Sequence, residues 1–79
     1  MESEDIKALL VEQFTDAVIE VTVEGSHVAL HIVSDIFDGL NTLKRQQKVY
    51  AVLSAHIASG EIHAVNMKTL TSQEATLAS

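Results

Sequence analysis

The chain contains no cysteine, no proline and no tryptophan among its 79 residues. Without cysteine it can form no disulfide, and it can build no metal site from its own thiolates. Its apolar runs are far shorter than the roughly 20 residues that cross a bilayer, so we expect no membrane segment. The acidic start, Met-Glu-Ser-Glu-Asp, differs from the basic start of a secretory signal. These absences predict a soluble, cytoplasmic chain.

Basic residues are scarce as well, with 5 Lys and Arg against 11 Asp and Glu, for a net charge of −6. Binding nucleic acid over the whole surface needs cationic side chains, so the composition leaves room only for a local basic patch. No nucleophile elbow, phosphate-binding loop or dinucleotide fingerprint is present, and we expect no enzyme. The length predicts a single domain over 1–79, and 47% apolar residues suffice for its core.

Hydrophobic periodicity predicts three strands and three helical regions. Two alternating segments flank Gly25-Ser26, a favourable hairpin turn. A helical crossover before the last strand allows that strand to pair in parallel. The elements expected are a helix over 4–15 capped by Ser3, strands over 18–24 and 27–34, a connection over 35–39, a helical region over 41–59 capped by Asn41 and broken or bent near 47–49, a strand over 62–69 and a short helix after Thr71. The fold class is therefore α+β, a three-stranded mixed sheet with helices packed on it.

Helical spacing also predicts which side chains face the sheet. They are Ile6, Leu9, Leu10 and Phe14 in the first helix, and Leu43, Tyr50, Leu53 and Ile57 in the central one, where Val49, Val52 and His56 widen the stripe.

Three of the five basic residues, Lys44, Arg45 and Lys48, lie in the polar middle of the chain. Lys44 and Lys48 are four apart and share one helix face. This segment is either a solvated helix face or a patch that contacts phosphates, and three cations would give weak, strongly salt-dependent binding. The same patch could instead meet an acidic face of a protein partner.

The candidate metal ligands are histidines, because neutral imidazole binds metal ions at cellular pH. Their spacing completes no mononuclear zinc site. His27 and His31 share a strand face about 13 Å apart, too far for one ion, and His56 is expected to pack on a helix flank. His63, at the entrance of the last strand, is either a half-buried histidine bonded to backbone or a ligand presented to a partner's metal.

Several segments, in this order and spacing, resemble the BolA-like proteins. They are the Gly25-Ser26-His27 turn, Phe37-Asp38-Gly39, Arg45, Val49-Tyr50 and Ile62-His63-Ala64-Val65. The pair Gln46-Gln47 before Val49-Tyr50 is most similar to the IbaG branch. The resemblance implies a type-II KH-like fold (αββααβα) without a Gly-x-x-Gly loop, and this chain has no glycines so spaced. It departs from the family at Asn41, where serine is common, and in a tail that lacks the usual proline and aromatic residue.

The resemblance also implies a function. In the family the histidine of the Ile/Val-His-Ala motif is a metal ligand, which matches His63. A histidine or cysteine between the first two strands is a second ligand, which favours His27 over His31. The implied protein is a non-enzymatic adaptor that binds a monothiol glutaredoxin with its glutathione and shares a bridging [2Fe-2S] cluster. Such clusters normally need four ligands, mostly thiolates, so a cysteine-free chain depends on its partner.

The alternative is a DNA-binding transcriptional regulator of the stress or morphology type, acting through Lys44, Arg45 and Lys48. Whether the free chain forms a homodimer is left open by the sequence.

Overall fold

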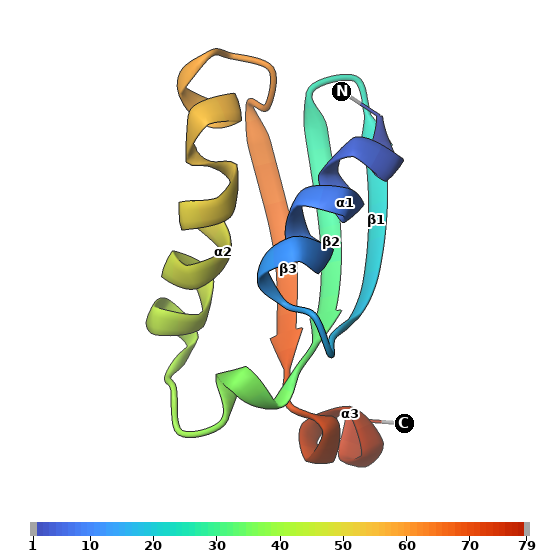
Figure 1. Ribbon diagram of the computed structural model, residues 1–79, viewed down its shortest axis with the longest axis vertical. Coiled ribbons are helices and arrows are strands. Elements are labelled where there is room, and N and C mark those ends of the chain that lie inside the picture. Colours follow the sequence, from blue (N-terminus) through green and yellow to red (C-terminus); the bar gives the residue numbers. More distant parts are fainter. Residues whose placement is uncertain (1, 79) are drawn as a thin grey trace.

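The computed structural model of the chain describes residues 2–78 (Figure 1). The elements are α1 (Ser3–Gln13), β1 (Val18–Glu24), β2 (His27–Val33), a 3₁₀ turn (Asp35–Phe37), α2 (Thr42–Ala58), β3 (Ala64–Leu70) and α3 (Ser72–Ala78). Strand β2 lies in the centre of the sheet, antiparallel to β1 and parallel to β3. The α+β class and the mixed three-stranded sheet are confirmed.

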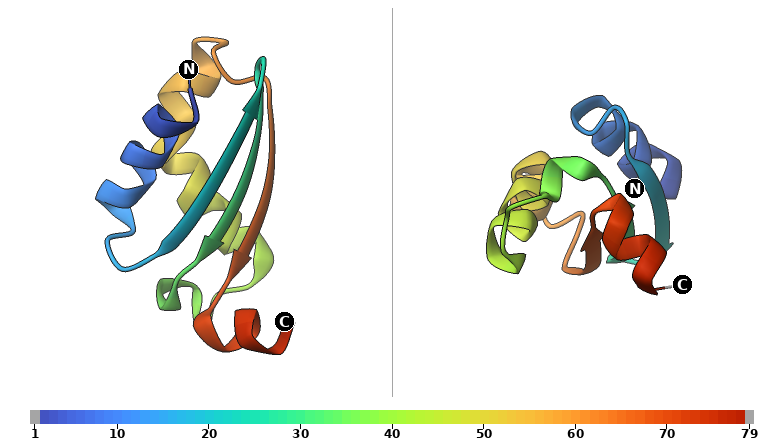
Figure 2. Two further views of the ribbon diagram at one scale, coloured as in Figure 1. Left: turned by 90° about the vertical axis from the view of Figure 1, so that its right-hand side faces the viewer. Right: turned by 90° about the horizontal axis from the view of Figure 1, so that it is seen from below.

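Only one face of the sheet is covered by helices. Figure 2 shows α1 and α2 on the same side of the sheet, with α3 beneath the end at which β2 and β3 finish. Alternate residues of β2 follow this division: Val28, Leu30 and Ile32 are buried, whereas His27 and His31 are exposed. The sheet therefore has an open, polar face.

The hydrophobic core lies between the sheet and the two long helices. Its buried residues are Ile6, Leu10, Phe14, Ile19, Val28, Leu30, Ile32, Phe37, Val49, Leu53 and Ile62. Phe37 reaches this core from the 3₁₀ turn and packs against Phe14, with ring centroids 5.8 Å apart and an interplanar angle of 47°. Ser34 begins the turn, because its Oγ accepts the N–H of Ile36 (3.3 Å).

The break predicted as one alternative near 47–49 is wrong, because α2 is continuous over Thr42–Ala58. That region contains neither glycine nor proline, and its Lys, Arg and Gln residues all favour helix. The extra helical element of the expected order is instead the 3₁₀ turn Asp35–Phe37.

The predicted inward face of α2 is also wrong in part. Val49 and Leu53 are buried, as is expected of a sheet-facing stripe. Leu43, Tyr50 and Ile57, however, are 62%, 39% and 37% exposed. The helix carries two apolar stripes, and only one can face the sheet.

Most element boundaries differ from the sequence prediction by one or two residues, and the starts of α1 and β3 have visible causes. The predicted Ser3 cap of α1 is wrong: Glu2 is the N-cap, Ser3 is the first residue of the helix, and Asp5 Oδ2 accepts the N–H of Glu2 (2.9 Å). Strand β3 starts at Ala64, because the N–H of buried Ile62 donates back to the carbonyl of His56 (3.2 Å). Among the described helices, none is long and apolar enough to cross a membrane.

Candidate functional site

The hairpin turn places the two candidate ligands at one end of the sheet. Gly25 supplies the positive φ (+61°) that the turn requires. The carbonyl of the next residue, Ser26, accepts the N–H of His63 (2.9 Å) and that of Ala64 (3.4 Å). His27 is in register with Ala64 across the parallel pair. His27 and His63 therefore lie at the same end of two neighbouring strands.

His63 has an anchored backbone and an exposed side chain. Within residues 2–78 its ring makes no hydrogen bond, so the alternative of a half-buried, backbone-bonded imidazole is not what the structure has. The ring borders Gly60, where an added Cβ would lie 3.7 Å from Nε2. Because the strand begins only at Ala64, the in-and-out alternation does not bury the ring of His63. The residue is therefore exposed at the surface beside the hairpin turn.

The open face of the sheet distinguishes His27 from His31. Both side chains are exposed on that face. His27 is opposite Glu24 at the hairpin end, whereas His31 lies four residues further along β2, between Glu20 and Lys68. His27 pairs with Ala64, the residue after His63, whereas His31 pairs with Lys68. Of the two histidines in β2, His27 is therefore the one at the same end of the sheet as His63.

The histidines and carboxylates of the described residues nowhere gather in threes to hold a metal ion. His63 and His27 thus offer imidazole donors without a complete coordination shell. Two imidazoles and no thiolate suit a minority share of an iron–sulfur cluster, since mixed histidine and cysteine ligation occurs. The donor set fits a cluster whose remaining ligands come from a second molecule.

A small polar network, which the sequence analysis missed, shapes the loop before His63. Nδ1 of His56 lies 3.1 Å from Oε1 of Glu61, and Ser59 Oγ donates to the same oxygen (3.0 Å). The hydrogen bond with His56, and after it the one with Ser59, holds the pKa of Glu61 below its usual value. His56 is half-buried at the end of α2. It helps to close the helix and to direct the chain into β3.

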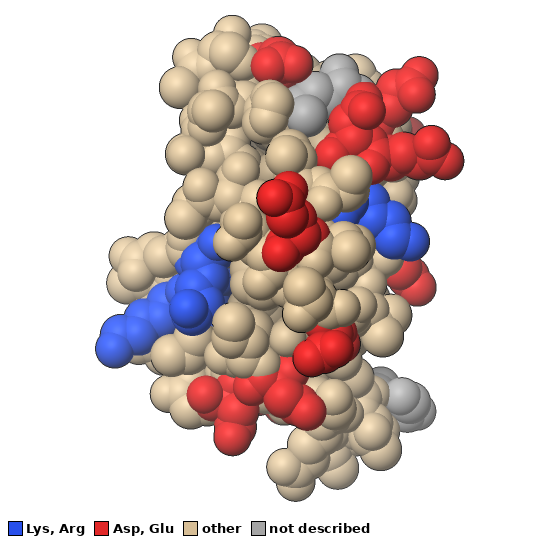
Figure 3. Space-filling view, viewed as in Figure 1, with Lys and Arg blue, Asp and Glu red and all other residues tan. Residues whose placement is uncertain are grey.

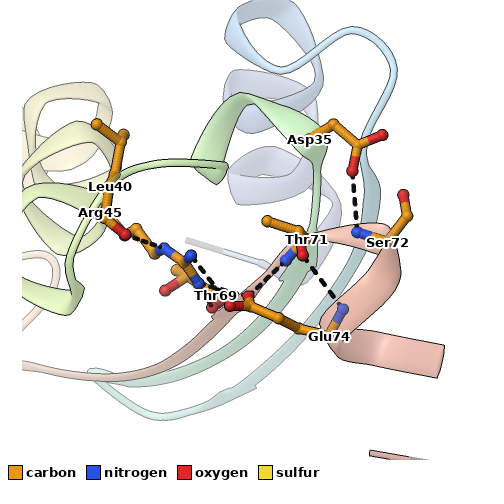
Figure 4. Close-up of polar contacts among 7 residues, drawn as sticks. All are labelled: Asp35, Leu40, Arg45, Thr69, Thr71, Ser72 and Glu74. Carbon is orange, nitrogen blue, oxygen red and sulfur yellow. Dashed lines mark hydrogen bonds and ion pairs between the residues drawn. The ribbon is translucent and has the colours of Figure 1, made fainter. Parts of the chain in front are cut away.

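The basic segment divides into two exposed lysines and one arginine that the fold uses. The guanidinium of Arg45 donates to the carbonyls of Leu40 (2.8 Å) and Thr69 (3.1 Å) and forms a two-pronged ion pair with Glu74 (2.6 and 3.1 Å; Figure 4). The side chain of Arg45 is only 13% exposed. Its pKa is raised by the hydrogen bonds to Glu74. The surface cations of this segment are therefore Lys44 and Lys48.

Figure 3 shows basic side chains over the lower half of α2, with acidic side chains below them and to their right. The exposed patch is thus narrow and neighboured by negative charge. This geometry limits how many phosphates it could contact.

Helix α3 docks although its segment lacks the proline and aromatic residue that the BolA resemblance leads one to expect. Thr71 and Glu74 cap each other, since Glu74 Oε1 accepts the N–H of Thr71 (2.9 Å) and Thr71 Oγ1 accepts that of Glu74 (3.2 Å). Asp35 Oδ1 accepts the N–H of Ser72 (3.0 Å). The Thr-x-x-Glu spacing is a sequence signal for such a box. The ion pair with Arg45 has no such signal.

Comparisons with known proteins agree with this architecture. The profile of the BolA-like protein family matches residues 8–74. An uncharacterized protein in the rpoN-murA intergenic region of Acinetobacter guillouiae is 40% identical over 74 residues, covering 94% of this chain and 89% of that protein. The acid stress protein IbaG of Escherichia coli strain K12 is 36% identical over 74 residues, covering 94% and 88%.

Solved structures of BolA-type proteins have the same fold. A Bol-like protein from Babesia bovis matches with a TM-score of 0.88 at 27% identity, covering 99% of this chain and 93% of that one. The BolA domain of SufE1 from Arabidopsis thaliana matches with a TM-score of 0.82 at 27% identity, covering 91% and 93%. From sequence and structure together, this chain belongs to the BolA family.

Proposed function

We propose that this chain is a non-enzymatic adaptor that binds a monothiol glutaredoxin and shares a bridging [2Fe-2S] cluster with it. His63 is the principal ligand of the chain and His27 the second. The observation that carries the proposal is the exposed ring of His63, whose backbone is tied to Ser26 at the end of β2 that holds His27. Membership of the BolA family supports a regulator or adaptor of this type.

The chemistry follows from the donors that the chain has and lacks. A sheet end fixes the direction of a ligand, so a partner can meet the imidazole at little entropic cost. The thiolates must come from the glutaredoxin and its glutathione, because this chain has no cysteine. When bound, the cluster supplies electron-transfer and cluster-transfer chemistry, and histidine ligation raises its reduction potential relative to thiolates alone.

The test is anaerobic reconstitution of the chain with a monothiol glutaredoxin, glutathione, iron and sulfide. We expect a heterodimer whose visible absorption and circular dichroism differ from those of the cluster-loaded glutaredoxin alone. His63→Ala should abolish that difference and His27→Ala should weaken or alter it. His31→Ala is the matched control, an exposed histidine of the same strand, and should leave the spectrum intact. An unchanged spectrum with His63→Ala would refute the ligand assignment.

DNA binding is the second candidate, and the two exposed lysines on one face of α2 favour it. With Arg45 bound within the fold, Lys44 and Lys48 can contact about two phosphates, so binding should be weak and strongly salt-dependent. Fluorescence anisotropy with duplex DNA at 20 and 150 mM salt tests this. Replacing both lysines by glutamine should flatten the salt slope, while Lys7→Gln on α1 should change it little. No binding at 20 mM salt would exclude this function.

A further inference from the structure

Strand β1 is a free edge of the sheet. Its only strand partner within residues 2–78 is β2, which pairs with it from Val18 to Glu24. The other edge strand, β3, has α2 alongside it, whereas no described strand continues the sheet beyond β1 (Figure 1). One side of β1 therefore carries backbone groups that no strand pairs.

The hairpin turn determines which residues present these groups. The turn has two residues, and the pair that flanks it, Glu24 and His27, is in register. Residues that flank a two-residue turn exchange both backbone hydrogen bonds, and every second pair along the strands does the same. Glu24 and Thr22 thus bond to β2. The N–H and C=O groups of Val21 and Val23 point the other way, to the free edge.

β1 has none of the features that usually block an edge strand. Such edges are commonly protected by proline, lysine, a bulge or a very short strand. β1 is seven residues long, contains neither proline nor lysine, and is paired with β2 without a bulge. The edge strand β3, by contrast, carries Lys68. Of the two edges, that of β1 is the one open to a further strand.

A hollow lies beside this edge, between β1 and the start of α1. Because Ile19 is buried, the accessible part of the edge spans 20–24. Val21 and Val23 are only partly buried against the core. An added strand would direct every second side chain to the same side of the sheet, next to these valines and the hollow. Aliphatic side chains suit that position. The hollow is lined by Ser3, Glu4, Lys7, Ile19, Glu20 and Val21.

The charges around the edge are mostly negative. Glu20 and Glu24 are exposed on the open face of the sheet, and exposed Glu4 lines the hollow. Among the described residues that line the hollow, only Lys7 is basic. Figure 3 shows acidic side chains gathered near the start of α1. Basic side chains of an added strand, placed opposite Glu20 and Glu24, would form favourable cross-strand pairs.

We propose that the β1 edge binds an extended, basic segment of another protein as an additional strand. The segment reads basic, apolar, polar, apolar, basic. Its apolar residues pair with Val21 and Val23 through about four backbone hydrogen bonds, and its basic residues lie opposite Glu20 and Glu24. Backbone bonds supply the affinity and the alternate side chains the specificity. This chain contains no such segment, so the occupant is not a second copy. The proposal does not rest on the proposed function.

The test is an NMR titration of the isotope-labelled full chain with the peptide acetyl-Gly-Lys-Val-Thr-Val-Lys-Gly-amide. We expect a Kd on the order of 1 mM at low salt. The amide protons of Val21 and Val23 should shift downfield as they gain acceptors, while the amides of β3 stay in place. The same peptide N-methylated at both valines should bind about tenfold more weakly, because it cannot donate to the edge. Equal binding of the two peptides, or shifts that leave out Val21 and Val23, overturns the proposal.

Charge reversal separates strand addition from general attraction between a basic peptide and an acidic chain. Glu20→Lys should weaken binding of the lysine peptide about fivefold. Glu12→Lys is the matched control, because it changes the net charge equally at an exposed position of α1 beside α2, and it should have little effect. A peptide with glutamate in place of both lysines should bind the double variant Glu20→Lys, Glu24→Lys and not the parent. Equal losses in the two single variants, or no binding of the glutamate peptide to the folded double variant, overturns the proposal.

Discussion

Phe37 is the residue that fixes the connection between β2 and α2. Its ring is fully buried against Phe14, although it comes from a three-residue turn. Phe37→Ala should lower the free energy of unfolding by about 3–5 kcal/mol, because it removes a large core side chain and leaves a cavity. Ile36→Ala, at the exposed neighbouring position, should cost about 1 kcal/mol or less. Urea denaturation of both variants measures the difference, and equal losses would contradict the role given to Phe37.

Glu74 makes stability depend on pH. The hydrogen bonds from Arg45, and then that from the backbone of Thr71, lower its pKa to about 2 from an ordinary 4.5. A carboxyl whose pKa is lower in the folded state stabilises that state above pH 4.5, and the contribution disappears as the pH falls towards 2. Glu74→Gln should therefore be less stable than the parent at pH 7, and the two should converge near pH 2.

Urea unfolding at pH 7 and at pH 2.5 checks this prediction. Glu12→Gln, an exposed carboxylate that forms no ion pair among the described residues, is the control and should show little change at pH 7. A gap between Glu74→Gln and the parent that is as large at pH 2.5 as at pH 7 would rule out the ion pair as its source.

Among single residues, the sequence named the two candidate ligands but missed two polar contacts that the fold makes. His63 and His27 were identified through the BolA resemblance, and the structure places them at one end of the sheet. The role of Arg45 within the fold was not predictable, because its partner Glu74 is 29 positions away and no periodicity links them. The His56–Glu61 contact was missed because it depends on the geometry of one loop.

Helix α2 depends on Asn41 for its start. Asn41 Oδ1 accepts the N–H of Lys44 (2.9 Å), which satisfies one of the free donors of the first turn. Asn41→Ala should cost about 1 kcal/mol of stability, whereas Asn41→Ser should be nearly neutral, because serine caps about as well. Thermal denaturation followed by circular dichroism compares the two. A serine variant as unstable as the alanine variant would show that the cap is not the cause.

Strand positions were easier to predict than helix faces. Alternation in β1 and a two-residue turn leave only one register, and the observed β1 has the predicted bounds 18–24. In α2, by contrast, two apolar stripes satisfy the same helical period. Packing against the sheet and α1 decides which stripe is buried. The periodicity of one helix contains no information about these packing partners.

Local unfolding of the whole molecule should begin at the edge strands of the sheet and at α3. Strand β2 is paired on both sides and alternates with three core residues, whereas β1 and β3 each have one free edge. Native-state hydrogen exchange should therefore be slowest for the amides of β2, such as Leu30, and fastest for the short helix α3. NMR-detected exchange measures this order. Protection of α3 equal to that of β2 would mean that the chain opens only as one unit.

The order of the strands along the chain has a consequence for how the histidine pair arises. β1 and β2 are joined by a tight turn, but β3 meets β2 only after the whole of α2 has been laid down. Closing such a long loop is slow compared with forming a hairpin, and a two-stranded hairpin alone is barely stable. A nascent chain thus presents His27 long before His63 can join it. The two imidazoles come to the same end of the sheet only when β3 pairs with β2. A partner that contacts both would therefore bind the folded chain and not a partly folded one.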